Sequence, residues 1–179
     1  MEPSAELADY RKQYPAKPMA RKPNNGDETV QMPTDQGAYE LCSPPASHSR
    51  FPRVSALPTS HETASDGRHL WVIRPADVPV ALEHCEWGKD LESKCIKHSN
   101  LTGGDPAHSG GEIWFIDTDR IAVNANSGRY GAKSEAEFRL IVDALRRSGY
   151  NVASMGFDLD TPSIPNSIFV GDPVWEPPL

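Results

Sequence analysis

The chain has 179 residues, which fits one domain of ordinary size, because domains cluster at about 100–150 residues. Its net charge of −7 disfavours broad binding along a nucleic-acid backbone. No apolar run approaches the ~18 residues of a transmembrane helix, and no signal-peptide pattern is present. We therefore expect a soluble protein without membrane partners, secreted without a cleaved signal peptide or delivered into a target-cell cytoplasm.

Residues 1–66 differ in composition from the rest of the chain. They hold nine of the 17 prolines and none of the four tryptophans. Such a segment buries too little apolar surface to offset its ordering entropy. Five basic residues lie between positions 11 and 22, which indicates a solvated tail, a contact with an anionic surface or a delivery segment. We predict a Pro-rich, largely irregular arm over residues 1–66 and an α+β domain over residues 67–179 with a Pro-rich C-terminal tail.

Apolar patterning predicts the first elements of this domain. Residues 70–73 form a short β-rich apolar run, which indicates a strand. The segment 77–88 has helical spacing of its apolar residues, with Asp77 as a candidate N-cap. Residues 94–98 predict another short strand.

The second half of the domain carries clearer signals. Two apolar runs, 112–116 and 120–123, are separated by a short polar turn and predict a β-hairpin. Residues 134–148 predict an amphipathic helix, with Ser134 as the N-cap and Gly149 as the C-terminal stop.

Two further strands are expected near the C-terminus, at residues 151–155 and at 168–170. The resulting order is β-α-β-β-β-α-β. This order predicts an α+β fold with a mainly antiparallel sheet, a central hairpin and two helices, preceded by the Pro-rich irregular arm.

Polar side chains and glycines are unusually dense between residues 97 and 131. If the hairpin pairs as expected, the start of its first strand and the end of its second strand lie at the same end of the sheet, which defines a candidate site. The candidate catalytic residues are His98, Glu112, Arg129 and Tyr130. The candidate substrate-binding residues are Ser99, Asn100, Gly103, Gly104, Asn126 and Ser127.

These groups suffice for phosphodiester cleavage without a metal or cofactor. His98 could take the proton of a 2′-OH, and Arg129 could stabilise the developing charge. Glu112 or Tyr130 could carry the second proton. The leading hypothesis is therefore metal-independent attack on RNA or a nucleotide, and it implies a ribonuclease-like hydrolase or lyase.

Two other functions remain open. The first is ADP-ribosyl transfer or NAD hydrolysis, with NAD as cofactor or substrate. It would use His98, Tyr130 and Glu112, or Arg74 with Ser99 and Glu112; Arg74 fits better because a helix is expected to follow it. The second is a non-catalytic protein-interaction module, in which the same polar groups only hold a loop together.

The pattern His-Ser-x-Leu-x-Gly-Gly from His98, followed by Gly-Gly-Glu112 and Ser-Gly-Arg-Tyr130, resembles a segment of plant IQ-motif calmodulin-binding proteins and of related bacterial and fungal proteins. The resemblance covers about residues 97–157. Arg129 stands where those relatives have histidine, and Glu112 stands at a position that is basic in some of them. No IQ helix is present, so calmodulin binding is not implied.

A small domain behind a Pro-rich segment is also similar in architecture to the toxin module of bacterial polymorphic toxins and secreted effectors. This resemblance implies a toxin or effector enzyme with an RNA, nucleotide or NAD substrate. It also implies a cognate immunity or inhibitor protein as a partner.

Overall fold

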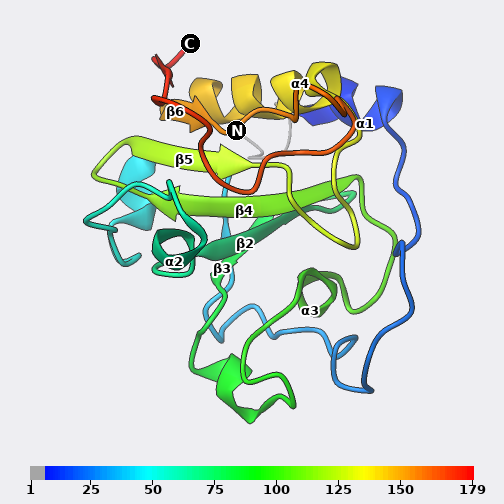
Figure 1. Ribbon diagram of the computed structural model, residues 1–179. Helices are drawn as coiled ribbons and strands as arrows, with labels where there is room; N and C mark the ends of the chain where they lie inside the picture. The colour runs from blue at the N-terminus through cyan, green and yellow to red at the C-terminus, as the bar shows by residue number, and fades with distance from the viewer. Residues whose placement is uncertain (1–6) are drawn as a thin grey trace.

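The computed structural model describes residues 7–179 and shows an α+β protein built on one seven-stranded sheet (Figure 1). The strand order is β1-β3-β2-β4-β5-β6-β7, and every neighbouring pair is antiparallel except β5 with β6. The strands are β1 (Tyr39–Glu40), β2 (His69–Ile73), β3 (Pro79–Leu82), β4 (Ser109–Phe115), β5 (Arg120–Asn124), β6 (Asn151–Ser154) and β7 (Trp175–Glu176). The predicted α+β class with a mainly antiparallel sheet is confirmed.

Four α-helices are present in the described chain, not the two expected from the sequence. They are α1 (Ala8–Gln13), α2 (His61–Ala64), α3 (His98–Thr102) and α4 (Glu135–Arg147). Three of them have only four to six residues, too few for a helical apolar stripe to show in the sequence. No helix within residues 7–179 is long and apolar enough to cross a membrane.

Helix α4 forms as predicted. The side chain of Ser134 accepts a hydrogen bond from Glu137 N at 3.1 Å, and Gly149 follows the helix at a φ of +108°. The apolar stripe that includes Phe138 and Leu145 is buried against the sheet. Because α4 carries the chain back across the sheet, β6 pairs with β5 in parallel, whereas short connections would have made an antiparallel pair.

The predicted hairpin is confirmed as β4 and β5, whose register pairs Glu112 with Asn124. Strand β2 lies on the other side of β4 and is buried on both faces. Trp71 contributes to the apolar cluster beneath α4, whereas Leu70 contributes to a second cluster, on the opposite face, that includes Leu101 of α3. Helix α3 and the candidate site therefore lie on the face of the sheet away from α4 (Figure 1).

The predicted helix over 77–88 is wrong, because residues 79–82 form strand β3 between β1 and β2. Val80 packs beneath α4 and Ala81 packs in the opposite cluster, so consecutive residues alternate between faces as they do in a strand. Asp77 does not cap a helix. Its Oδ1 accepts a hydrogen bond from Arg74 Nε at 2.6 Å.

Two predicted strands are also wrong. Residues 94–97 are irregular and are followed by helix α3, with Lys94 at a φ of +61° and Gly103 ending the helix at a φ of +68°. Residues 168–170 form no strand. The edge strand is β7, where Trp175 pairs with Ala153 of β6.

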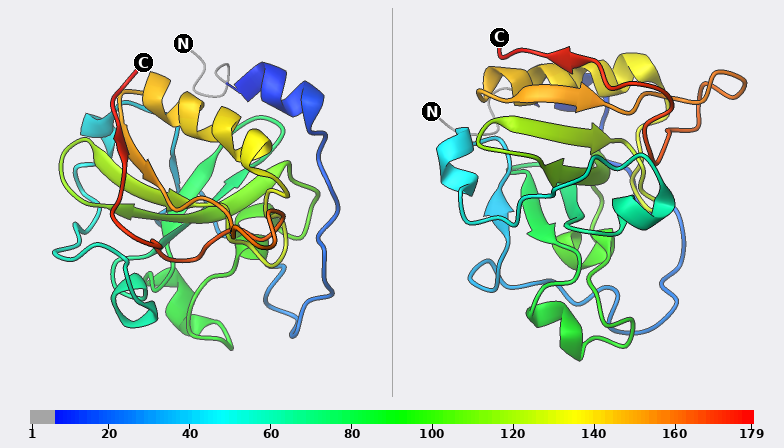
Figure 2. Two further views of the ribbon diagram at one scale, coloured as in Figure 1. Left: turned by 45° about the horizontal axis from the view of Figure 1, so that its top comes forward. Right: turned by 60° about the vertical axis from the view of Figure 1, so that its left-hand side comes forward.

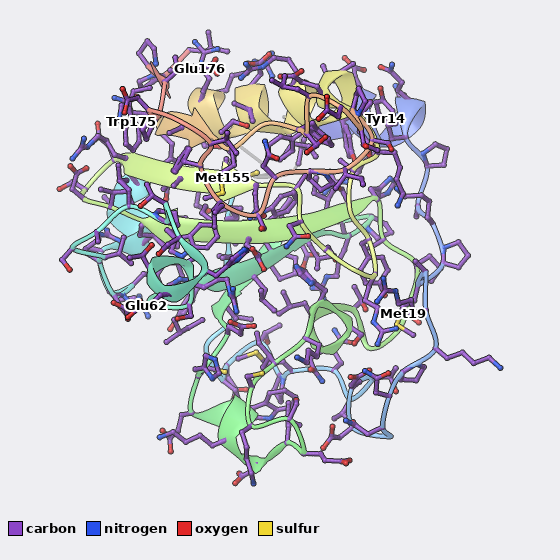
Figure 3. All side chains as sticks on the ribbon, in the orientation of Figure 1. Tyr14, Met19, Glu62, Met155, Trp175 and Glu176 are labelled. Atoms are coloured by element: carbon purple, nitrogen blue, oxygen red, sulfur yellow. The ribbon has the colours of Figure 1, made fainter. Side chains whose placement is uncertain are left out.

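The irregular arm is not confirmed, because the segment 7–66 is packed into the fold along much of its length (Figure 2). Leu7, Tyr10, Leu41 and Phe51 belong to the cluster beneath α4. Tyr14, which directly follows α1 (Figure 3), stacks on Tyr10 with ring centroids 5.2 Å apart. A low apolar content did not prevent this packing, since a few large side chains are spaced along the segment.

Replacing Tyr10 with phenylalanine tests whether this segment is an integral part of the fold. The Tyr10 hydroxyl donates to Glu137 Oε1 at 2.9 Å in a buried contact between α1 and α4. Because a buried carboxylate would lose a donor, we expect the free energy of unfolding to fall by about 1–3 kcal/mol. Urea unfolding at pH 7 measures it. Phenylalanine at the exposed end of the same helix, Gln13→Phe, serves as the control, and an unchanged midpoint for Tyr10→Phe would contradict the prediction.

Candidate functional site

A cavity of about 300 Å³ lies among α3, the end of β3, the loop after β5 and a part of the N-terminal segment. Its volume is at the low end of the range for small-molecule sites. The lining residues are Arg21, Asn24, Glu28, Leu70, Glu83, Lys97, His98, Gly128 and Arg129. Two candidate catalytic residues, His98 and Arg129, therefore line the same cavity although 31 positions separate them in the sequence.

His98 is held by the backbone of β4. Its Nε2 lies 2.8 Å from Gly111 O, and a carbonyl oxygen only accepts, so we assign the proton of the neutral ring to Nε2. A Cβ placed on Gly110 would lie 3.3 Å from His98 Cδ2, so the Cδ2 and Nε2 edge of the ring faces the strand. The Nδ1 lone pair lies on the other edge and has no hydrogen-bond partner within residues 7–179.

Burial sets the charge state of His98. The residue is 9 % exposed, and burial lowers its pKa to about 4, although the Gly111 carbonyl and Glu83 favour the protonated ring. The ring is therefore neutral at pH 7. A neutral imidazole with an unpartnered Nδ1 beside a cavity can accept a proton from a bound molecule.

Arg129 reaches the cavity from the loop after β5 and is paired with the N-terminal segment. Its Nη2 lies 2.9 Å from Glu28 Oε2, and its Nη1 donates to Lys22 O at 2.8 Å. The two charged side chains are 11 % and 3 % exposed, so this ion pair is buried. The cation that was expected to bind an anion thus has an internal carboxylate beside it.

Two further cations line the cavity, and the sequence did not single them out as site residues. Arg21 and Lys97 form no ion pair with a carboxylate in the described part of the chain. Arg21 belongs to the basic run between positions 11 and 22, and that run was the available signal for an anionic contact. Their positions in space depend on packing between segments about 75 residues apart.

Glu112 lies next to this cavity without lining it. Its Oε2 accepts a hydrogen bond from Asn124 Nδ2 at 2.9 Å, and its Oε1 is 3.9 Å from Arg68 Nε. Arg68 also pairs with Glu83, a cavity residue, at 2.7 Å. Burial raises the pKa of Glu112, whereas the bond from Asn124 and the charge of Arg68 lower it.

Tyr130 is directed elsewhere. Its side chain is buried in the cluster that contains Leu101, and its hydroxyl lies 2.9 Å from both Thr102 Oγ1 and Asp105 O. Burial raises the pKa of this phenol. Tyr130 holds the loop after α3 to the loop after β5, and it does not line the cavity with His98.

Three of the expected substrate-binding residues hold the N-terminal segment instead. The amide of Asn100 donates to the carbonyls of Asp27 and Val30, both at 2.9 Å. Gly103 and Gly104 have φ values of +68° and +86°, and a Cβ on either would come within about 3 Å of residues 29–31. These glycines therefore allow a chain segment, not a ligand, to approach.

Of the other three, Ser127 and Asn126 have structural contacts within the loop after β5. Ser127 Oγ accepts hydrogen bonds from the backbone of Arg129 at 3.3 Å and of Tyr130 at 3.1 Å, which shapes the turn. Asn126 N donates to Asn124 Oδ1 at 3.0 Å. Ser99 is fully buried, and its hydroxyl has no partner within residues 7–179. None of the three lines the cavity.

The arrangement considered for NAD chemistry around Arg74 loses its structural basis. The expected helix after Arg74 is strand β3. The guanidinium is held by Asp77 and donates to Leu101 O at 2.9 Å. Arg74 lines two other cavities, and neither Ser99 nor Glu112 lines them.

No family model, no curated protein and no solved structure matches this chain. The resemblance to IQ-motif proteins and the toxin or effector role stay predictions. Within residues 7–179, no three His, Cys, Asp or Glu side chains gather in a way that could hold a metal ion.

Proposed function

We propose that this protein binds a short ribonucleotide phosphodiester, such as a dinucleotide or the end of a single-stranded RNA, in the cavity beside His98 and cleaves it without a metal. The observation that carries the proposal is the placement of a neutral, nine-tenths buried histidine with a free Nδ1 in a cavity that three cations line. Cations stabilise phosphate oxygens, and an unprotonated imidazole removes a proton from an attacking hydroxyl.

The reaction that fits these groups is internal transesterification. His98 Nδ1 takes the proton of a 2′-OH, the 2′ oxygen forms a bond to phosphorus, and the bond from phosphorus to the leaving 5′ oxygen breaks. Water protonates the leaving oxygen, because neither Glu112 nor Tyr130 lines the cavity. Arg21 and Lys97 lie where they can stabilise charge that develops on the phosphate.

Size and charge favour a small substrate. A cavity of about 300 Å³ suits one nucleotide unit, and a net charge of −7 opposes long polyanions. NAD hydrolysis has no comparable support. The residues considered for it around Arg74 do not share a cavity, and of His98, Tyr130 and Glu112 only His98 lines this one.

Cleavage of RNA and of nucleotide phosphodiesters in the presence of EDTA tests this function. We expect His98→Gln to reduce the rate at least about 100-fold, because a general base contributes 10²–10⁴-fold and glutamine has none. Glutamine can still donate to Gly111 O and preserve the local structure. The matched control is His108→Asn, since His108 is also buried and bonds a carbonyl, that of Tyr14, but lies outside the cavity.

Two results would overturn the proposal. One is a protein that releases no product from either substrate class, and the other is His98→Gln with unchanged activity. Nicotinamide release from NAD, measured in parallel, would favour the alternative enzyme class.

A further inference from the structure

Residues 17–32, which we name the strap, cross the cavity and are anchored at both ends. At one end, Lys17 and Ala107 exchange backbone hydrogen bonds of 2.8 and 3.0 Å. At the other, Met32 N donates to Asn100 O at 2.7 Å. Met19, within the strap, packs against the apolar cluster around α3 (Figure 3). The strap is thus a fixed wall of the cavity.

The strap places one carboxylate directly on a cavity cation. Glu28 Oε2 contacts Arg129 Nη2 at 2.9 Å, and the same oxygen accepts a hydrogen bond from Asn24 N at 2.9 Å. Glu28 is 2 % exposed and lines the cavity. A carboxylate and a phosphate oxygen compete for the same guanidinium, because both accept the same charge-assisted hydrogen bonds.

We propose that Glu28 is an internal anion that occupies the Arg129 end of the cavity and limits phosphate binding there. This inference rests on the proposed function, because it takes the cavity as the phosphate site. A bound phosphate contacts Arg21 and Lys97 freely, but it gains Arg129 only when Glu28 is displaced. Displacement of the Glu28 side chain from Arg129 therefore controls phosphate affinity at this site.

Replacing Glu28 with glutamine tests the inference directly. Glutamine keeps an oxygen where Asn24 N and Arg129 Nη2 donate, but it removes the negative charge. We expect inorganic phosphate, titrated calorimetrically into the full chain at pH 7 and low ionic strength, to bind about tenfold more tightly to Glu28→Gln than to the unchanged protein. Glu28→Asp keeps the net charge and withdraws the carboxylate by one methylene, so it should also bind phosphate more tightly.

Two controls separate a local effect from a change in net charge. Asp27→Asn removes the same charge one residue away, where Oδ2 accepts from Glu92 N and the residue does not line the cavity. We expect its phosphate affinity to change less than about twofold. Adding Glu28→Gln to Arg129→Gln should produce no gain over Arg129→Gln alone, since the competing cation is gone.

The outcomes are distinct from those of the activity test. Tighter binding by both Glu28 variants, with Asp27→Asn unchanged, supports the inference even if no substrate is cleaved. Equal or weaker binding by Glu28→Gln and Glu28→Asp overturns it, because Glu28 would then position Arg129 instead of competing for it. Failure of all variants to bind phosphate also overturns it. If the enzyme is active but its Glu28 variants bind phosphate no more tightly, the proposed function stands and the inference about Glu28 is overturned.

Discussion

Lowering the pH from 7 to 5 is expected to reduce the free energy of unfolding by about 4 kcal/mol through two buried histidines. Burial lowers the pKa of both His69 and His98 to about 4, against about 6.5 in an unfolded chain. Between these values the unfolded state binds more protons than the native state. Stability is therefore full above pH 6.5 and is lost as the pH falls toward 4.

Chemical denaturation between pH 7 and 5 measures this dependence, and His69→Asn isolates one contribution. Asparagine can still donate to Gly67 O, as His69 Nδ1 does at 3.0 Å, but it does not titrate. We expect the pH slope to fall by about half. Burial raises the pKa of Glu40 and Glu112, so these groups contribute with the opposite sign, and burial lowers the pKa of His48, which contributes with the same sign. The comparison of variants removes all three. An unchanged slope in His69→Asn would contradict the assignment.

The second large effect is expected at Gly111, which pairs with Trp71 across β4 and β2. A Cβ on Gly111 would lie 2.5 Å from the Trp71 ring and would also clash with the carbonyl of Asn124 in β5. The Asn124 oxygen belongs to the backbone of the sheet. The Trp71 ring is fully buried and donates to Glu112 O at 3.2 Å, so neither neighbour can move away freely. We expect Gly111→Ala to lower the free energy of unfolding by about 3 kcal/mol or more.

Thermal and urea unfolding of Gly111→Ala check the prediction. Gly26→Ala is the control, because nothing lies within 4 Å of a Cβ built there. The same substitution should weaken cleavage, since the Gly111 carbonyl orients His98. Native stability in Gly111→Ala would show that β2, β4 and β5 are less closely packed than described.

Local sequence patterns predicted the elements whose stabilising contacts are local or follow a strong periodicity. Helix α4 has its own cap and a complete apolar stripe, and the hairpin has its turn between two apolar runs. The prediction of a helix over residues 77–88 was wrong because four apolar positions fit a helical period by chance. The strand structure of this segment depends on pairing with β2 on one side and with β1, almost 40 residues earlier in the chain, on the other. The spacing of apolar residues within the segment does not show either partner.

The candidate site divides in the same way, into residues that the sequence identified and residues that it missed or misassigned. His98 and Arg129 were identified by residue type and dense polar surroundings, and both line one cavity. The substrate-binding roles expected for Asn100, Gly103 and Gly104 came from composition. These residues instead contact the strap. Glu28 and Arg21 were outside the expected site, because their proximity to His98 arises from contacts across about 70 residues of sequence.

The hydrogen bonds from Asn100 to the carbonyls of Asp27 and Val30 have a consequence for truncated variants of this protein. A composition boundary at residue 66 suggests that the remainder would fold and function alone. Cutting there would remove Arg21 from the cavity, strip the donors of Asn100 of their acceptors and expose the apolar surface under Met32. A protein truncated at residue 66 would therefore not represent the fold or the cavity of the full chain, even if it expressed well.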